Sequence, residues 1–224
     1  ELHLITQTMK RTNPERQLTE QDMRWLNNEL LAFGVKNIVY FTYHVHGSDG
    51  NGFDYDSSFV DETGEKTDVY YAMQEIMAEN KAFQQTYQSF DIQSTKVYYQ
   101  GAEAHNGVYG HYAHNVNYRD NSLYENDSVT FNALTNVVQN SELTLISEFA
   151  GGNGYMYAIM NATDSKYATD YTAHDTVTLT FNAAYTHAIV WRNGVKKLVA
   201  LDANHSLEVE NAAGEVTYVI PYSA

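Results

Sequence analysis

The chain contains no cysteine among its 224 residues. Disulfide bonds, a thiolate nucleophile and zinc sites built on cysteine are therefore excluded. The sequence also has no stretch long and apolar enough to cross a membrane as a helix. It does not predict a membrane span.

Basic residues are scarce as well. Thirteen Lys and Arg stand against 28 Asp and Glu, which gives a formal net charge of −15. Surfaces that bind nucleic acids concentrate Lys and Arg, so the composition disfavours a nucleic-acid partner. A neutral ligand such as a sugar is compatible with this charge, and so is a role of the charge in solubility alone.

The first 90 residues alternate between strand and helix patterns. Glu1–Met9 and Val35–His44 read as strands, and Thr19–Phe33 and Thr67–Gln88 read as helices. This β-α-β-α order is typical of a parallel sheet, and parallel strands need cover on both faces and neighbours at both edges. We therefore expect the chain to be the C-terminal piece of a larger (β/α) protein.

The helix ends carry clear capping signals. Thr19 is the expected N-cap of the first helix, with Asp22 three residues later as a weaker form of the capping box. Gly34 follows the first helix at the position where helices commonly end with a residue in the left-handed backbone conformation. Thr67 is the natural N-cap of the second helix.

The pattern changes near Ser94, where apolar and polar residues begin to alternate between turn residues. Asn193-Gly194 is the strongest hairpin signal in the chain. The many short strands predict an antiparallel β-sandwich, and we place the domain boundary between residues 1–94 and 95–224. The candidate strands are Val97–Tyr99, Val108–Tyr112, Ser128–Phe131, Leu143–Phe149, Tyr155–Met160, Thr176–Phe181, Ala188–Trp191, Lys197–Leu201, Ser206–Val209 and Val216–Pro221.

Several segments resemble one enzyme group in order along the chain. Thr19–His44 resembles the last helix–strand step of the (β/α)8 barrel in bacterial glycoside hydrolases related to the family 42 β-galactosidases. Phe59–Gln74 looks like the entry to their final helix, and Ser141–Asn161 is similar to the start of their C-terminal β-sandwich. The residues that fit the helix–strand pattern are Arg24, Trp25, Ala32, Gly34, Ile38, Tyr40, Phe41 and Tyr43, whereas Val35, Asn37 and Ser147 depart from the family's residues.

The resemblance implies a fold of α/β plus all-β class. A C-terminal βαβα segment of a TIM barrel would be followed by an antiparallel β-sandwich. The partners would be a carbohydrate substrate and the upstream barrel segment of the same protein, and the location would be secreted or cell-surface in a bacterium. Enzymes of this kind need no metal or cofactor.

The same resemblance leaves the catalytic residues unknown. Glycosidases use two carboxylates that flank the scissile bond. In such barrels the acid/base typically comes from an earlier strand, outside this chain, and the nucleophile lies near the end of the seventh strand. The expected seventh strand ends in Thr6–Met9, which contains neither Asp nor Glu. Either the nucleophile lies elsewhere, the chemistry has been lost, or the register differs.

Four residues are candidate substrate contacts at the barrel mouth, namely Gln7, Tyr43, His44 and His46. The amide and imidazoles could hydrogen-bond sugar hydroxyls, and Tyr43 could stack on a pyranose face. Strand alternation prevents Tyr43 and His44 from both pointing inward. His44 and His46 could also ligate a metal, but no third ligand is evident, so we predict no metal site.

For two further clusters of residues we favour a structural role over a ligand-binding one. A Gly-rich loop carries Asp49, Asn51, Asp54 and Asp56, which could hold Ca²⁺ but are also typical turn residues. Exposed tyrosines near residues 105–118 could form a carbohydrate platform, although half-buried strands have the same pattern. This second cluster consists of His105, Tyr109, His111, Tyr112, His114 and Tyr118.

Three functions remain open from the sequence. The first is the C-terminal portion of a glycoside hydrolase acting on oligo- or polysaccharide, and the enzymatic part of it is uncertain. The second is a non-catalytic carbohydrate-binding or surface protein on the same scaffold. The third is a structural module that docks domains to one another.

Overall fold

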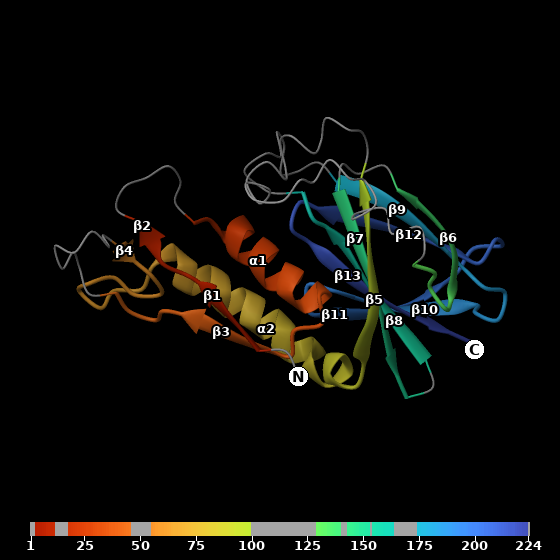
Figure 1. Ribbon diagram of the computed structural model, residues 1–224, viewed down its shortest axis with the longest axis horizontal. Helices are drawn as coiled ribbons and strands as arrows, with labels where there is room; N and C mark the ends of the chain where they lie inside the picture. The colour runs from red at the N-terminus through yellow and green to blue at the C-terminus, as the bar shows by residue number, and fades with distance from the viewer. Residues whose placement is uncertain are drawn as a thin grey trace.

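The computed structural model describes residues 3–11, 18–45, 55–99, 129–139, 143–152, 154–163 and 174–223. Figure 1 shows two helices that lie between a short strand pair and a β-sandwich. In chain order the elements are β1 (His3–Gln7), β2 (Lys10–Arg11), α1 (Glu20–Ala32), β3 (Asn37–Phe41), β4 (Tyr55–Ser57), α2 (Asp68–Gln88), β5 (Asp91–Tyr99), β6 (Leu134–Gln139), β7 (Leu143–Gly151), β8 (Gly154–Asn161), β9 (His174–Phe181), β10 (His187–Arg192), β11 (Val195–Ala200), β12 (Ser206–Ala212) and β13 (Val216–Tyr222).

Both helices begin where their capping residues predict. The Thr19 hydroxyl accepts a hydrogen bond from the Asp22 N–H, and the Asp22 carboxylate accepts one from the Thr19 N–H at 2.7 Å. This reciprocal pair is a capping box, and it is confirmed. Thr67 caps α2 by accepting from the Tyr70 N–H. Gly34 has a φ of 80°, so the chain leaves α1 through a left-handed residue.

Helix α1 connects β1 to β3, which run parallel with Ile5 paired to Val39. The two helices pack against each other through a bidentate ion pair, in which Arg24 donates to both carboxylate oxygens of Glu79 at 2.6 and 3.2 Å. Behind this pair, the Asn27 carboxamide oxygen accepts from the Tyr40 hydroxyl at 2.9 Å. The helices and β3 therefore form one packed unit.

The remaining strands form a two-layer sandwich. One sheet has the strand order β11-β10-β13-β8-β7-β5, and the other has the order β12-β9-β6. All pairings within them are antiparallel. The sheets enclose a core that includes Ile146, Tyr157, Ile159, Leu179 and Val219. The expectation of a β-sandwich is confirmed in this coarse form.

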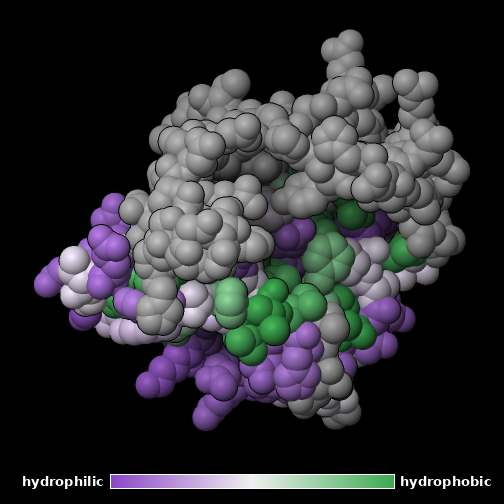
Figure 2. All heavy atoms as spheres, turned by 60° about the vertical axis from the view of Figure 1, so that its left-hand side comes forward, coloured by the Kyte–Doolittle hydropathy of each residue, from purple (hydrophilic) through white to green (hydrophobic). Residues whose placement is uncertain are grey.

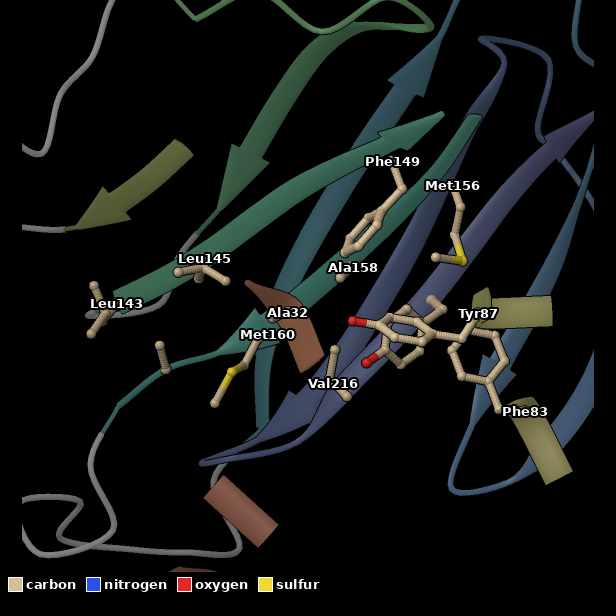
Figure 3. Packing of buried hydrophobic residues seen from close by; sticks show 12 residues of the cluster. Ala32, Phe83, Tyr87, Leu143, Leu145, Phe149, Met156, Ala158, Met160 and Val216 are labelled. Atoms are coloured by element: carbon tan, nitrogen blue, oxygen red, sulfur yellow. The ribbon is translucent and has the colours of Figure 1, made fainter. Parts of the chain in front are cut away.

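The helices cover the outer face of the six-stranded sheet. Figure 3 shows Ala32, Phe83 and Tyr87 pointing from the helices toward Phe149 and its neighbours on the strands. The Phe83 ring lies 4.3 Å from the ring of Tyr218 on β13. Burial of this many apolar side chains joins helices and sandwich into a single structure.

The TIM-barrel part of the predicted fold class is wrong. The described residues contain two helices and are mostly β, and the two main sheets are antiparallel. The βα pattern at the start of the chain is real, but it amounts to one parallel crossover. The repeat does not continue, because the chain after α2 enters the antiparallel sheet through β5. The helices consequently pack against a sandwich, and no ring of βα units is present in the described ranges.

The individual strand predictions have mixed outcomes. Most sandwich strands lie within a few residues of their predicted positions. The Asn193-Gly194 hairpin is confirmed, with φ values of 47° and 71°. The predicted strand Ser128–Phe131 is wrong over residues 129–131, and β6 was not predicted. The division at residue 94 stays a prediction, and β5 extends across it.

Some predictions fall outside the described residues. These are His46, the strand Val108–Tyr112, the acidic-loop residues Asp49, Asn51 and Asp54, and the whole cluster at residues 105–118. Within the described part of the chain, neither helix is long and apolar enough to cross a membrane.

Candidate functional site

The carboxyl ends of β1 and β3 meet at one end of the molecule. Gln7 pairs with Phe41, and the Thr8 N–H donates to the Phe41 carbonyl at 2.8 Å. The buried hydroxyl of Thr8 donates to the Thr42 carbonyl at 3.1 Å and lies 2.9 Å from the hydroxyl of Ser58. These hydrogen bonds fix the positions of the residues just after each strand.

Tyr43 extends from this fixed strand end into solvent. Its side chain is 59% exposed, and its ring centroid lies 5.9 Å from that of Phe59. Phe59 is buried and also contacts the Tyr40 ring at 6.2 Å. One side of the Tyr43 ring is thus supported by the core while much of its surface remains accessible.

The first turn of α2 adds two more tyrosines. The ring centroids of Tyr70 and Tyr71 lie 5.5 Å apart in an edge-to-face arrangement. Tyr71 is 53% exposed because Val69 and Met73 take the core-facing positions of the helix. The side-chain nitrogen of Lys66 lies 4.3 Å from the centre of the Tyr70 ring, within cation–π range.

Lys66 links Tyr43 to the helix tyrosines electrostatically. Its pKa is raised, first by a side-chain hydrogen bond with Tyr70 and then by electrostatic interactions that include Tyr71 and Tyr43. The backbone brings them together, because the Val60 N–H donates to the Tyr43 carbonyl at 3.2 Å and Val60 also pairs with Lys66. The three tyrosines and Lys66 thus lie near one another at the ends of β1 and β3. We call Tyr43, Lys66, Tyr70 and Tyr71 the tyrosine cluster.

A turn beside the cluster holds its loop in place. One carboxylate oxygen of Asp61 accepts from the Thr63 N–H at 2.9 Å, from the Thr63 hydroxyl at 2.7 Å and from the Glu65 N–H at 2.9 Å. The hydrogen bond from the Thr63 hydroxyl is the main reason why the pKa of Asp61 lies below its ordinary value. Asp61 is thus a turn residue that remains ionised, which does not suit a general acid.

The predicted contact residues are only partly brought together. Gln7 is exposed, and its amide nitrogen donates to the Met9 carbonyl at 3.4 Å. His44 is half-buried, and its backbone forms a parallel bridge with Val60. Of the three that can be placed, Gln7 and Tyr43 are exposed. Gln7 and Tyr43 thus lie at the ends of paired strands, and their role as substrate contacts stays a prediction.

The sequence interpretation missed Lys66, Tyr70 and Tyr71. A signal was available, since Thr67 is a clear N-cap and the apolar spacing from Val69 leaves Tyr71 on the outer face. What the sequence could not show is that the start of α2 lies beside the end of β3. That proximity depends on how the chain between them folds back.

Metal binding has no evident site here. No group of three or more His, Asp or Glu side chains that could hold a metal ion occurs in the described ranges. Of the histidine pair considered for a metal, only His44 can be placed.

A fully buried carboxylate lies elsewhere, inside the sandwich. Glu148 accepts hydrogen bonds from the N–H and the amide side chain of Asn132, both at 2.6 Å, and from the Tyr157 hydroxyl at 2.5 Å. The same hydroxyl accepts from the Ala133 N–H at 2.9 Å. Burial, followed by the hydrogen bond to Glu148, raises the pKa of Tyr157 above its ordinary value. These contacts make Glu148 a structural clamp between the strands and leave it no access to a substrate.

Comparison with known protein families found no family that matches this chain, and no curated protein matches it. The tyrosine cluster therefore has to be interpreted from its own geometry.

Proposed function

We propose that this protein binds carbohydrate without hydrolysing it, and that the tyrosine cluster is the contact surface. The observation that carries the proposal is the grouping of exposed Tyr43 and Tyr71 with Lys66 and Tyr70 at the joined ends of β1 and β3, where the backbone of Val60 pairs with both Tyr43 and Lys66. Rigid aromatic faces with a polar rim are a common way to bind a ligand that has both apolar and hydroxyl surfaces.

The chemistry of the cluster suits a pyranose. The flat face of the Tyr43 ring offers an apolar surface for the C–H groups of a sugar, and the phenol hydroxyls and the Lys66 ammonium offer hydrogen bonds to its hydroxyls. Gln7 can add an amide from the neighbouring strand. A neutral ligand also avoids repulsion from a chain with a net charge of −15.

Binding is favoured over hydrolysis by the residues at the strand ends. A glycosidase needs two carboxylates on either side of the bond that is cleaved. Gln7, Thr8, Thr42 and Tyr43 are uncharged, and the nearby Asp61 is committed to its turn. Glycoside hydrolysis and a secreted bacterial location rest on the sequence resemblance and stay predictions.

Affinity electrophoresis through gels that contain soluble polysaccharides tests the proposal. At least one gel from a panel of β-glucans, galactans and mannans should retard the chain. Tyr43→Ala and Tyr71→Ala should each weaken binding roughly tenfold, because removing a central aromatic contact commonly costs about 1–2 kcal/mol.

Tyr222→Ala is the matched control, since Tyr222 is a similarly exposed tyrosine at the far end of β13. It should bind as the unaltered chain does. Unchanged retardation in both cluster variants, or no retardation in any gel, contradicts the proposal. Release of reducing sugar from a retarding polysaccharide would instead favour hydrolysis.

A further inference from the structure

The β1–β3 pair has an exposed apolar face, of which the proposed carbohydrate site uses only Gln7. Among the described residues, β1 and β3 pair only with each other. Their register puts Ile5 beside Val39 and Gln7 beside Phe41 on one face. Ile5 is 72% exposed and Phe41 is 56% exposed. Figure 2, which brings this end of the molecule forward, shows hydrophobic residues gathered on the surface.

A groove runs beside the same strand pair, between β3 and α2. Its volume is about 350 Å³, and its walls include Ile38 and Tyr40 from β3 and Met77, Lys81 and Gln84 from α2. Met77 is half-exposed in this groove. Side chains of a strand added beside β3 would alternate between this groove and the exposed face of the β1–β3 pair.

The charge of the groove differs from that of the whole chain. Its charged lining residues are Lys36 and Lys81, with no Asp or Glu, although acidic residues outnumber basic ones by 28 to 13 overall. Lys36 donates to the carbonyl oxygens of Tyr87 and Phe90 and forms an ion pair with Asp91 at 4.0 Å, so the charge offered to an occupant is that of Lys81. Lys81 is exposed on α2. An acidic side chain on an occupant would complement Lys81.

We propose that the outer edge of β3 and this groove bind an extended segment of another protein, which adds to the sheet as a strand. The segment alternates apolar residues, which cover the exposed face of the β1–β3 pair, with polar ones, which enter the groove and include an acidic residue opposite Lys81. Backbone hydrogen bonds to β3 supply affinity, and the groove and Lys81 supply specificity.

A second copy of this chain fits the groove poorly. A symmetric dimer brings the same patch of both copies together. The Lys81 side chain of one copy would then lie beside the groove of the other copy, which carries lysine as well. The charge of the groove therefore selects a different, acidic partner segment.

The test uses the full chain and a short labelled peptide in which valine alternates with threonine and glutamate. Fluorescence anisotropy should show saturable binding, and Lys81→Glu should weaken it about fivefold, as expected for loss and reversal of an exposed charge pair. A peptide with lysine in place of glutamate should show the opposite preference, binding Lys81→Glu more tightly than the unaltered chain.

Two controls locate the contact. Lys197→Glu changes a similarly exposed lysine on β11, an edge strand of the six-stranded sheet, and should leave peptide binding unchanged. A peptide N-methylated on the amides of one edge should lose most of its affinity, because its backbone no longer pairs. Tyr43→Ala should bind the peptide normally, which separates this surface from the carbohydrate site.

Several outcomes overturn the proposal. Absence of saturable binding excludes the site. If Lys197→Glu lowers the affinity for the peptide as much as Lys81→Glu does, the peptide binds elsewhere. Equal binding of the N-methylated peptide excludes strand addition. Self-association of the chain that competes with the peptide assigns the surface to a second copy.

Discussion

At the scale of single residues, buried polar groups join parts of the chain that lie far apart in sequence. Glu148 on β7 holds the segment before β6 through Asn132 and holds β8 through Tyr157. Glu148 is 1% exposed, so its carboxylate depends on these protein donors. A buried acceptor of this kind contributes stability mainly because its loss leaves its donors unpaired.

Replacement of Glu148 should separate the roles of charge and shape. Glu148→Ala leaves the Asn132 N–H and the Tyr157 hydroxyl without their acceptor and should lower the free energy of unfolding by about 3 kcal/mol. Glu148→Gln keeps an acceptor oxygen and should cost less. Urea denaturation measures both, with the exposed Glu208→Ala on β12 as the control. Equal stability of the Ala variant and the control contradicts the clamp.

At the scale of elements, α1 docks onto the sandwich through a close backbone approach. The Trp25 indole N–H donates to the Ala162 carbonyl at 3.0 Å, and the Asn28 amide donates to the Gly214 carbonyl at 2.8 Å. A Cβ atom at Gly214 would lie 2.9 Å from the Cβ of Trp25. The turn before β13 thus requires glycine for its φ of 80° and for the space that α1 occupies.

A matched pair of glycine substitutions measures this contact. Gly64 has a φ of 88° with nothing near its missing Cβ, so Gly64→Ala reports backbone strain alone, about 1 kcal/mol. Gly214→Ala adds the collision with Trp25 and should cost about 1–3 kcal/mol more. Thermal unfolding of both variants gives the comparison, and equal losses mean that α1 moves away without cost.

The elements also show which sequence signals determine structure locally. Capping at Thr19 and Thr67 and the Asn193-Gly194 turn could be predicted, because each is settled by residues a few positions apart. The barrel prediction failed because a β-α-β pattern specifies one crossover and does not determine the elements after it. The sequence indicated only Tyr43 of the tyrosine cluster for a similar reason, since Tyr43 lies at a strand end that the pattern shows and Tyr71 comes near it only through tertiary packing.

At the scale of the whole molecule, helices and sandwich share one core. Phe83 and Tyr87 of α2 are buried in the same cluster as Phe149 and Tyr218 of the sheet. Neither part can unfold without exposing the apolar surface of the other. Cooperative behaviour is expected from this shared burial.

The two tryptophans provide separate probes of this cooperativity. Trp25 lies on α1 and Trp191 lies on β10, and the chain has no other tryptophan. Trp191→Phe leaves Trp25 on α1 as the reporter, and Trp25→Phe, which also removes the hydrogen bond to the Ala162 carbonyl, leaves Trp191 on the sheet face that packs against Phe83. Within each variant, the urea midpoint from tryptophan fluorescence should coincide with that from far-ultraviolet circular dichroism. A fluorescence midpoint well below the other would show that the parts unfold separately.

The place of β13 in the six-stranded sheet has a consequence for synthesis. This strand comes after every other described strand in the chain, yet it lies between β8 and β10. While a ribosome is still making residues 216–222, the strands β5, β7 and β8 on one side and β10 and β11 on the other have no strand between them to complete the sheet. The sheet therefore closes only after this segment has left the exit tunnel, and a nascent chain stalled before it exposes two half-sheets to chaperones and proteases.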